Sequence, residues 1–232
     1  MCGRFTLTYG TADQLALELG IAFDAIQRKR YRPRYNIAPS DEHWVLRGER
    51  EERELLPSRW GLVHANGGPR AAKRAARPIN ARAETIDRSP AFREAFGERR
   101  CVVPADGYFE WMGPKKARRP IWFHRGDGGL LLFAGLYEIG HSEPETPQVT
   151  FTIITTKANR VVERVHDRMP VILDEGSVDE WLFTPTAERA KLHALLLPAV
   201  DDALVGTPVN PRVNSVRYDD PECLAVASSM LL

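Results

Sequence analysis

The chain opens with MCGRF, which places a cysteine directly after the initiator methionine. A penultimate cysteine is small enough for a methionine aminopeptidase to act, so we expect Met1 to be removed. Cys2 would then carry a free α-amine and a free thiol on adjacent carbons, two nucleophiles that can act on one electrophile. Most chains that begin Met-Cys make no use of this pair, so the rest of the sequence has to decide its role.

Three further segments carry polar residues where a strand or turn would normally avoid them. PINARAET contains Asn80, Arg82 and Glu84, which share one face if the segment is extended. ADGYFEWMG places Glu110 among aromatic residues, where an apolar environment would raise its pKa. VHDRMPVIL places His166 just before an apolar strand. A carboxylate among aromatic rings and a histidine at the mouth of a strand suit acid–base catalysis, although each fits a salt-bridged core glutamate or a surface histidine as well.

Composition sets broad limits on these candidates. The 232 residues are 43% apolar and 27% charged, as in an ordinary soluble protein, and we expect one domain over residues 1–232. No apolar run approaches a membrane span or a signal-peptide core. The three cysteines lack CxxC spacing, which favours the reducing cytoplasm and argues against structural zinc. HExxH, GxSxG, P-loop and GxGxxG motifs are absent, so we predict no metal and no cofactor.

Positive charge is clustered although the net charge is only +1. The clusters are RKRYRPR at residues 28–34, PRAAKRAARPINAR at residues 69–82 and KKARR at residues 115–119. Clustered arginine and lysine in a near-neutral chain favour an anionic partner on one face. For any single cluster, a solvated loop is the simpler interpretation.

The elements that must position these residues can be read from patterning. TADQLALELG predicts a helix with Thr11 as N-cap and Gly20 as terminator, and SPAFREAFG predicts another between Ser89 and Gly97. Short β-rich runs fill the middle of the chain, and helical patterns return after Thr156, with capped starts at Ser177 and Thr186. Strands and helices do not alternate as in βαβ units. We therefore predict an α+β fold: a curved mixed or antiparallel sheet with a barrel-like core and flanking helices.

Seven motifs occur in the order and spacing of the SOS-response-associated peptidase family, which this chain resembles from residue 2 to VNPRVNSV. They are MCGRF, YNIAPS, RWGLV, NARAET, GYFEW, IITTKAN and HDRMPVIL. The family includes abasic-site sensor proteins. The resemblance implies that Cys2 captures abasic sites in single-stranded DNA as a stable cross-link: the amine attacks the sugar aldehyde and the thiol closes a thiazolidine ring.

The resemblance also implies a role for each matched residue. Glu110 and His166 would move protons, and Asn80 would hold the Cys2 amine or the sugar. Arg4 and Arg82 would grip phosphates beside the lesion, because guanidinium matches phosphate oxygens. The remaining implied DNA-binding residues are Asn36, Trp60, Thr156 and Arg168. Of these, Asn36 and Thr156 would supply supporting hydrogen bonds, and Trp60, like Trp111, suits the core or the site wall better than base stacking.

One departure from the family pattern concerns the loop after Trp60. The family usually continues WGLxPxW, with a tryptophan that wedges against unstacked bases, whereas this chain reads WGLVHANGG. The sequence therefore does not decide which residue acts as the wedge or which DNA junction is preferred. His64 is a candidate for part of the wedge role.

Two other functions remain open at this point. Cys2 could act as the nucleophile of a thiol peptidase that removes Met1 autocatalytically, or the chain could be a non-catalytic binding module for modified DNA. The arginine-rich segments favour DNA over a peptide substrate. We expect a cytoplasmic monomer, located at the nucleoid when bound to DNA, with no membrane partner.

Overall fold

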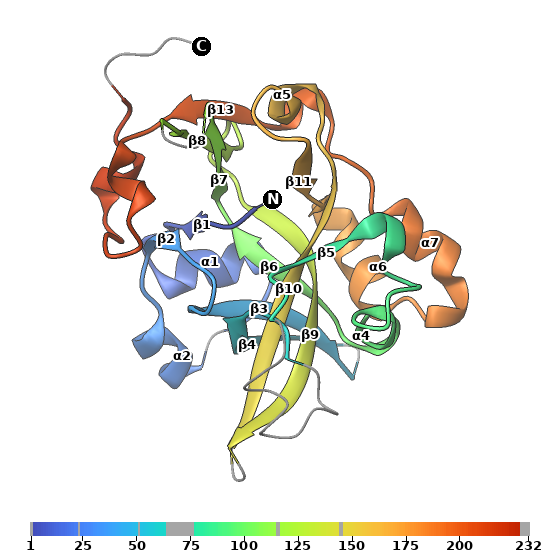
Figure 1. Cartoon of the computed structure of the whole chain (residues 1–232). Helices are drawn as coiled ribbons and strands as arrows, with labels where there is room; N and C mark the ends of the chain where they lie inside the picture. Colours follow the sequence, from blue (N-terminus) through green and yellow to red (C-terminus); the bar gives the residue numbers. More distant parts are fainter. Residues whose placement is uncertain are drawn as a thin grey trace.

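Figure 1 shows the computed structural model of the chain, which describes residues 2–22, 24–50, 52–63, 77–114, 117–143 and 146–227. His64, the basic residues Arg70, Lys73 and Arg74, and the pair Lys115 and Lys116 lie outside the described residues.

A closed five-stranded β-barrel forms the centre of the fold. Its strands follow the order β10, β4, β3, β6 and β9, and β9 pairs back with β10 to close the ring. The β10–β4 pair is parallel, and the other pairs of the ring are antiparallel. The bounds of these strands are Thr146–Lys157, Glu52–Trp60, Glu42–Glu49, Arg100–Ala105 and Leu131–Glu143. The predicted α+β fold with a barrel-like core is confirmed.

Three short strands extend the barrel sheet, and a second sheet covers one end of the barrel. β11 (Arg168–Pro170) and β5 (Asn80–Arg82) pair with β10, and β12 (Ile172–Leu173) pairs with β9. The second sheet is antiparallel, in the order β13, β8, β7, β1 and β2. Its strands span Val205–Pro208, Arg119–His124, Gly107–Met112, Phe5–Leu7 and Arg34–Ile37. The N-terminal strand β1 is thus hydrogen-bonded on both edges.

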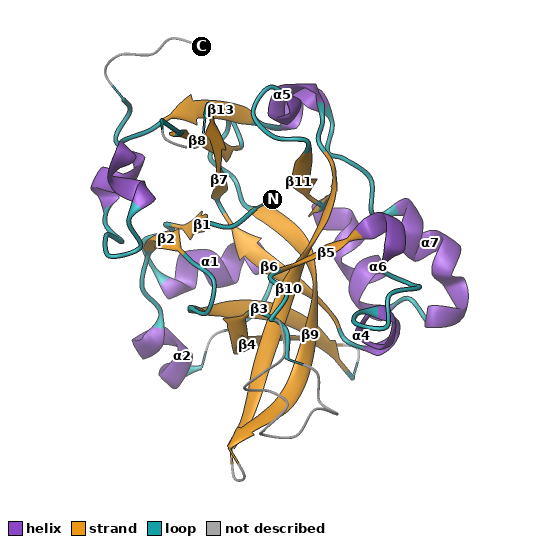
Figure 2. Cartoon of the chain, viewed as in Figure 1, coloured by secondary structure: helices purple, strands orange, loops and turns teal. Residues whose placement is uncertain are grey.

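The helices lie on the outside of this two-sheet core (Figure 2). They are α1 (Ala12–Leu19), α2 (Ala25–Arg30), α4 (Arg93–Glu98), α5 (Arg160–Glu163), α6 (Val178–Phe183) and α7 (Arg189–Ala194). Short 3₁₀ turns η2 to η7 span Ala83–Thr85, Glu175–Ser177, Thr186–Glu188, Asp201–Ala203, Pro211–Asn214 and Pro221–Leu224. None of the helices in the described part of the chain has the length and apolar character needed to cross a membrane.

Helix ends were predicted with mixed success. At α1 the prediction is confirmed: Thr11 and Gln14 form a reciprocal capping box, and Gly20 ends the helix with a φ of 62°. At α4 the predicted start is wrong, because the helix begins at Arg93 and not after Ser89. The chain first makes a turn in which the Ser89 carbonyl accepts the amide hydrogens of Phe92 and Arg93.

The two later caps were also predicted wrongly. Helix α4 continues through Gly97, its predicted terminator, to Glu98. Thr186, predicted to cap the helix that follows it, donates its hydroxyl hydrogen to the Gly97 carbonyl. Thr186 therefore ties two segments together instead of capping its own helix. Ser177 makes no side-chain capping bond.

An aromatic cluster joins β1 to the interior of the barrel. The Phe5 ring lies edge-on to His43, with centroids 4.7 Å apart, and edge-on to Trp60 at 5.0 Å. Trp60 stacks on Phe151, and its Nε1 donates to the Ile79 carbonyl at 2.9 Å. Trp60 is only 1% exposed, so its side chain belongs to the core and does not present a surface for contact with DNA.

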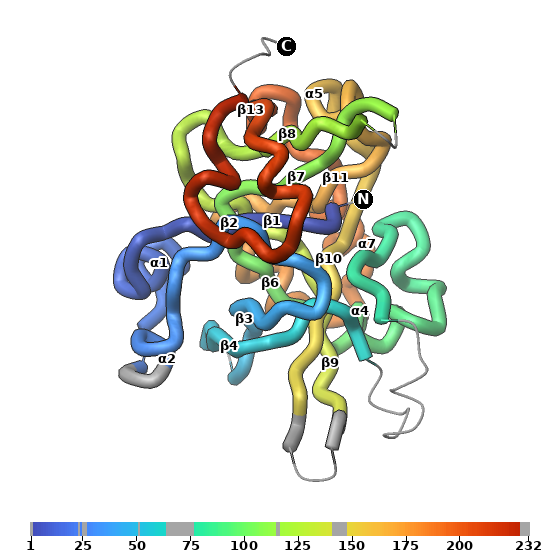
Figure 3. The backbone as a smooth tube through the Cα atoms, turned by 60° about the vertical axis from the view of Figure 1, so that its left-hand side comes forward, coloured from blue at the N-terminus to red at the C-terminus, as the bar shows by residue number. Residues whose placement is uncertain are grey.

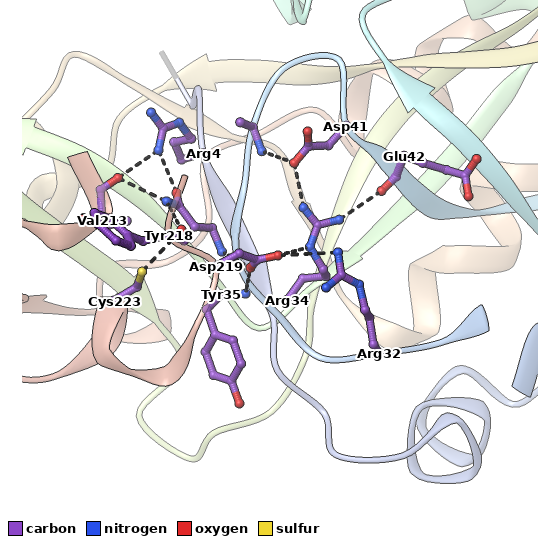
Figure 4. Close-up of polar contacts among 12 residues, drawn as sticks. Arg4, Arg32, Arg34, Tyr35, Asp41, Glu42, Val213, Tyr218, Asp219 and Cys223 are labelled. Atoms are coloured by element: carbon purple, nitrogen blue, oxygen red, sulfur yellow. Dashed lines mark hydrogen bonds and ion pairs between the residues drawn. The ribbon is translucent and has the colours of Figure 1, made fainter. Parts of the chain in front are cut away.

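The C-terminal segment, residues 211–227, packs beside β2 and β1 (Figure 3). Asn36 donates from Nδ2 to the carbonyls of Val213, Ser215 and Tyr218, and it is 1% exposed. Asp219 accepts the backbone amide hydrogens of Tyr35 and Asn36 and pairs with Arg34, as Figure 4 shows. Asn36 and Asp219 therefore fasten this segment to the second sheet.

We predict that His43 makes the fold acid-sensitive. Its ring is buried, and burial lowers its pKa from 6.5 to about 3 while Nε2 contacts the Pro104 carbonyl at 2.8 Å. The unfolded chain takes up this proton first, so stability is lost as pH falls from 6.5 towards 3. At about 1.4 kcal/mol per pKa unit, the loss is on the order of 4–5 kcal/mol.

Urea unfolding as a function of pH measures this effect. His43→Gln removes the titrating group, so its stability should change less between pH 6.5 and pH 4 than that of the parent chain. Equal acid dependence of the parent and His43→Gln would rule out this role.

Candidate active site

Four residues far apart in the sequence gather around the start of β1. Asn80 donates from Nδ2 to the Cys2 carbonyl at 2.9 Å. The charge of Glu110 contributes to the raised pKa of the Cys2 thiol, and His166 in turn acts on the pKa of Glu110. The predicted catalytic set of Cys2, Asn80, Glu110 and His166 therefore forms one cluster.

Each member of this cluster is held by a different element. Cys2 precedes β1, whose Phe5 pairs with Tyr108 of the neighbouring strand β7. Glu110 lies two residues further along β7, so it shares a face of the sheet with Tyr108. Asn80 begins β5, which runs parallel to β10 with Asn80 opposite Ile153. His166 lies in the connection between α5 and β11.

Glu110 is nearly inaccessible, with 4% of its surface exposed. Burial raises the pKa of its carboxyl, and the nearby His166 opposes the rise. An acid with a raised pKa can hold a proton closer to neutral pH and release it to a reacting oxygen. The aromatic surroundings of Glu110 in the sequence predicted this environment.

Cys2 is completely buried in the chain that still carries Met1. Burial, and then the negative charge of Glu110, raise the pKa of its thiol above the usual range. The Sγ atom lies 3.8 Å from the Arg4 carbonyl, within donor distance for sulfur. The thiol is therefore held as S–H near neutral pH.

His166 has a partner for each of its protonation states. Its Nδ1 accepts the Arg168 amide hydrogen at 2.9 Å, which places the proton of the neutral ring on Nε2. Asp167 Oδ1 lies 2.9 Å from the same nitrogen and forms an ion pair with the protonated ring. These two contacts fix the orientation of the ring near Glu110.

Tyr108 belongs to this cluster although the sequence analysis did not select it. It is fully buried, and burial, followed by the charges of Cys2 and Glu110, raises its pKa. Its hydroxyl has no hydrogen-bond partner among the described residues, and neither does Asn80 Oδ1. Buried polar atoms without partners are rare in cores and mark places where a ligand can bind. The spacing of Tyr108 and Glu110 along one strand is the signal that could have identified the tyrosine.

Arg4 directly precedes β1 and contacts the C-terminal segment. Its Nη1 donates to Asn36 Oδ1 at 2.7 Å and to the Val213 carbonyl at 2.9 Å, and the guanidinium lies over the Trp111 ring. Burial lowers its pKa. Asn36 is 1% exposed and bonds both Arg4 and the C-terminal segment, so the hydrogen bonds that it supplies are internal ones.

Arg82 and Arg168 occupy contrasting positions. Arg82 ends β5, is exposed, and makes no ion pair with another described residue. The Arg168 guanidinium pairs with the Glu84 carboxylate and reaches the Thr155 carbonyl. Arg168 is thereby bound internally, which suits a positioning role beside His166 better than a phosphate contact.

Two neighbouring predictions also need correction. Glu84 does not share the face of Asn80 and Arg82, because β5 ends at Arg82 and Ala83–Thr85 forms the turn η2. Thr156 is 6% exposed, and it is the adjacent Thr155 that contacts Arg168. Thr156 therefore contributes through the packing of β10.

No metal centre accompanies this cluster in the described residues: no three His, Cys, Asp or Glu side chains there lie close enough to hold an ion. A hollow of about 820 Å³ lies between the start of β9 and the α7–η5 segment, and its lining includes none of the site residues named above.

The fold and the cluster define a class of protein: a β-barrel with a covering sheet that holds the cysteine following Met1 beside an amide, an acid and a histidine. The model of the family described as SOS response associated peptidase (SRAP) matches residues 1–216. The chain belongs to this family.

Similar proteins agree with that assignment. The chain is 36% identical to the "Abasic site processing protein YoqW" of Bacillus subtilis, over 97% of this chain and 99% of the relative. It is 31% identical to the "Abasic site processing protein HMCES" of Gallus gallus, over 97% of this chain and 77% of the relative. A crystal structure of a Bacteroides thetaiotaomicron protein aligns with a TM-score of 0.86 at 25% identity, covering 97% of this chain and all of that one.

We predict that Glu110 lowers the stability of the fold above its ordinary pKa of 4.5. In that range the folded state binds more protons than the unfolded state, so stability falls as pH rises. Glu110→Gln cannot ionise and should melt at a higher temperature than the parent chain at pH 8. At this chain length, 1 kcal/mol corresponds to about 2–4 °C.

Glu84→Gln is the matched control, with the opposite expected sign. The hydrogen bond from Arg168 lowers the pKa of Glu84, so this carboxylate stabilises the fold above its ordinary pKa, and that contribution is lost as pH falls. Its Gln variant should melt at a lower temperature at pH 8. Thermal melts of both variants between pH 5 and pH 8 test the pair; a lower melting temperature for Glu110→Gln at pH 8 would indicate a structural glutamate instead.

Proposed function

We propose that this protein processes abasic sites in single-stranded DNA by forming a covalent cross-link through Cys2. The chief support is the convergence of Asn80, Glu110 and His166 on a cysteine that follows the initiator methionine. The names of its curated relatives agree with abasic DNA as the substrate.

The first step uses the amine that Met1 removal would expose. The closed sugar of an abasic site equilibrates with an open-chain aldehyde. Proton transfer by Glu110 and His166 would accelerate this ring opening. An α-amine has a reference pKa of about 8, so a useful fraction is neutral near pH 7 and can attack the aldehyde carbon. The resulting carbinolamine loses its hydroxyl as water when Glu110 supplies a proton, leaving an imine.

The second step uses the thiol of the same residue. The Cys2 sulfur adds to the imine carbon, the S–H bond breaks, and the proton is transferred to the nitrogen, which closes a five-membered thiazolidine. Ring closure removes the imine that would otherwise promote β-elimination and strand cleavage. Asn80, bonded to the Cys2 carbonyl, holds the residue in position for both steps.

A thiol peptidase is the alternative that the family description raises. Such an enzyme needs a thiolate as nucleophile. The raised pKa of the buried Cys2 thiol opposes its formation. A chain that only binds modified DNA would have no use for the acid–base pair beside Cys2.

The deciding experiment incubates the protein with a single-stranded oligonucleotide carrying one abasic site, followed by denaturing electrophoresis. We expect a heat-stable band of protein joined to DNA. Lack of this band with protein whose Met1 has been removed would exclude the cross-linking function.

Cys2→Ser should form the imine but close the ring poorly, because a hydroxyl is a weaker nucleophile than a thiol. We expect a less stable adduct and more cleaved oligonucleotide in the same gel. Cys223→Ser is the control, since this sulfur lies in the C-terminal segment, within 3.6 Å of the Tyr218 carbonyl. A Cys2→Ser adduct as durable as the parental one would contradict thiazolidine formation.

Arg82→Ala should weaken binding to damaged and undamaged strands alike, because a phosphate contact carries no base information. On a single strand, each neutralised phosphate contributes about 0.7 to the slope of log affinity against log salt. The slope should therefore fall by about 0.7 in a fluorescence-anisotropy titration. Arg93→Ala, an exposed position on α4, should leave the slope unchanged.

A further inference from the structure

A small apolar pocket lies beside the candidate active site and has no part in the chemistry proposed above. Its volume is about 280 Å³, close to the lower end of the usual range for small-molecule sites. Four elements build its walls: β7 and β8 of the second sheet, α5 with the residues that follow it, and the start of β13. Its apolar lining includes the side chains of Met112, Ile121, Phe123, Val161, Val165 and Leu204.

Strand register places this pocket on the same face of the sheet as the catalytic cluster. Ile121 pairs with Glu110, and Phe123 pairs with Tyr108 across the β7–β8 ladder. Met112 follows Glu110 by two residues, about 7 Å along the strand. The Phe123 ring stacks on Tyr108 with centroids 5.3 Å apart. The pocket therefore begins where the acid–base cluster ends.

The facing wall connects to the same cluster from the other side. Val161 and Val165 line the pocket, and His166 directly follows Val165 in the chain. Anything bound here would touch both the strand that carries Glu110 and the segment that carries His166. The opposite face of the sheet is closed by the C-terminal segment, where Phe109 packs with Val213 and Cys223.

Positive charge lies at the pocket's rim. Arg164 lines the pocket and is exposed. Arg119 pairs with Met112 on the adjacent strand, so the described end of the third basic cluster reaches the same edge of the sheet. Apolar walls below a cationic rim suit a flat, weakly polar group that is joined to an anion.

We propose that this pocket binds the unstacked nucleobase of a nucleotide adjoining the abasic site, with its phosphate at Arg164. The proposal rests on the cross-linking function proposed above. The step from Glu110 to Met112 is comparable to one nucleotide of an extended single strand. The side chains that line the pocket offer one charged group and no neutral hydrogen-bonding group. The pocket therefore contacts the flat faces of a base and does not distinguish bases by the hydrogen-bonding groups on their edges.

The direct test compares oligonucleotides that differ only in the base next to the lesion. Each carries one stable abasic analogue, and the neighbouring nucleotide on the 5′ or 3′ side holds either 2-aminopurine or a second baseless sugar. We expect loss of the neighbouring base on one side to weaken binding about 5- to 100-fold, the range that stacking of one base supplies. Equal affinity with and without the base on both sides would overturn the proposal.

Emission of 2-aminopurine reports where the base goes. Stacking on neighbouring bases quenches it, so transfer into a largely aliphatic pocket should raise the emission when protein is added. The same base placed several nucleotides from the lesion is the control and should not respond. An unchanged emission next to the lesion on both sides would also count against the pocket.

Two variants connect these signals to the pocket. Val161→Trp fills it and should abolish both the emission change and the advantage of the neighbouring base, whereas Val161→Ala should keep both. Thermal melts show whether each variant is folded, and if Val161→Trp is not, Arg164→Gln decides. Arg164→Gln should weaken binding of the base-containing oligonucleotide, whereas Arg160→Gln, at the start of α5 where Arg160 pairs with Asp201, should not.

These readouts separate the two proposals. Binding and emission need no covalent step, so they test the pocket even if no cross-link forms. Conversely, an oligonucleotide that carries a natural, aldehyde-forming abasic site beside a stable baseless sugar keeps Cys2 chemistry possible, so a heat-stable band on it supports cross-linking whatever the pocket does. Full retention of the base effect in both folded Val161→Trp and Arg164→Gln would assign it to another surface.

Discussion

The arrangement of the site depends on how the start of the chain is held. Chain termini are ordinarily mobile, so a reactive residue near the N-terminus needs restraint. Here β1 has only three residues but is hydrogen-bonded to β7 and β2 on its two edges, and Phe5 inserts among the aromatic rings of the barrel. Asn80 adds a hydrogen bond to the Cys2 carbonyl. Cys2 is thereby fixed relative to Glu110, which belongs to the same sheet.

Restraint of this kind is combined with polar groups that lower stability. The Tyr108 hydroxyl and Asn80 Oδ1 are buried without partners among the described residues, and burial raises the pKa of Glu110. An unpartnered buried polar group costs about 1–3 kcal/mol. The closed barrel and its aromatic core offset that cost.

Support for the site also comes from outside its immediate surroundings. The C-terminal segment is fastened to β2 by Asn36 and Asp219, and the same Asn36 amide orients Arg4. On the other side, Glu84 holds Arg168, whose backbone amide fixes the tautomer of His166. Ion pairs and buried amides thus act mainly by orienting the groups beside Cys2, and the exposed Arg82 remains available to an anion.

Local pattern was enough to predict the α+β class, the α1 caps and most strands, because these follow from periodicity and short-range hydrogen bonding. Glu110 was identified by its aromatic neighbours alone. Sequence could not decide that Trp60 and Asn36 are buried, that Glu84 leaves its strand to pair with Arg168, or that Tyr108 adjoins Cys2. Each depends on contacts between segments far apart in the chain. Only closure of the barrel and insertion of β1 between β7 and β2 bring residues 2, 80, 110 and 166 together.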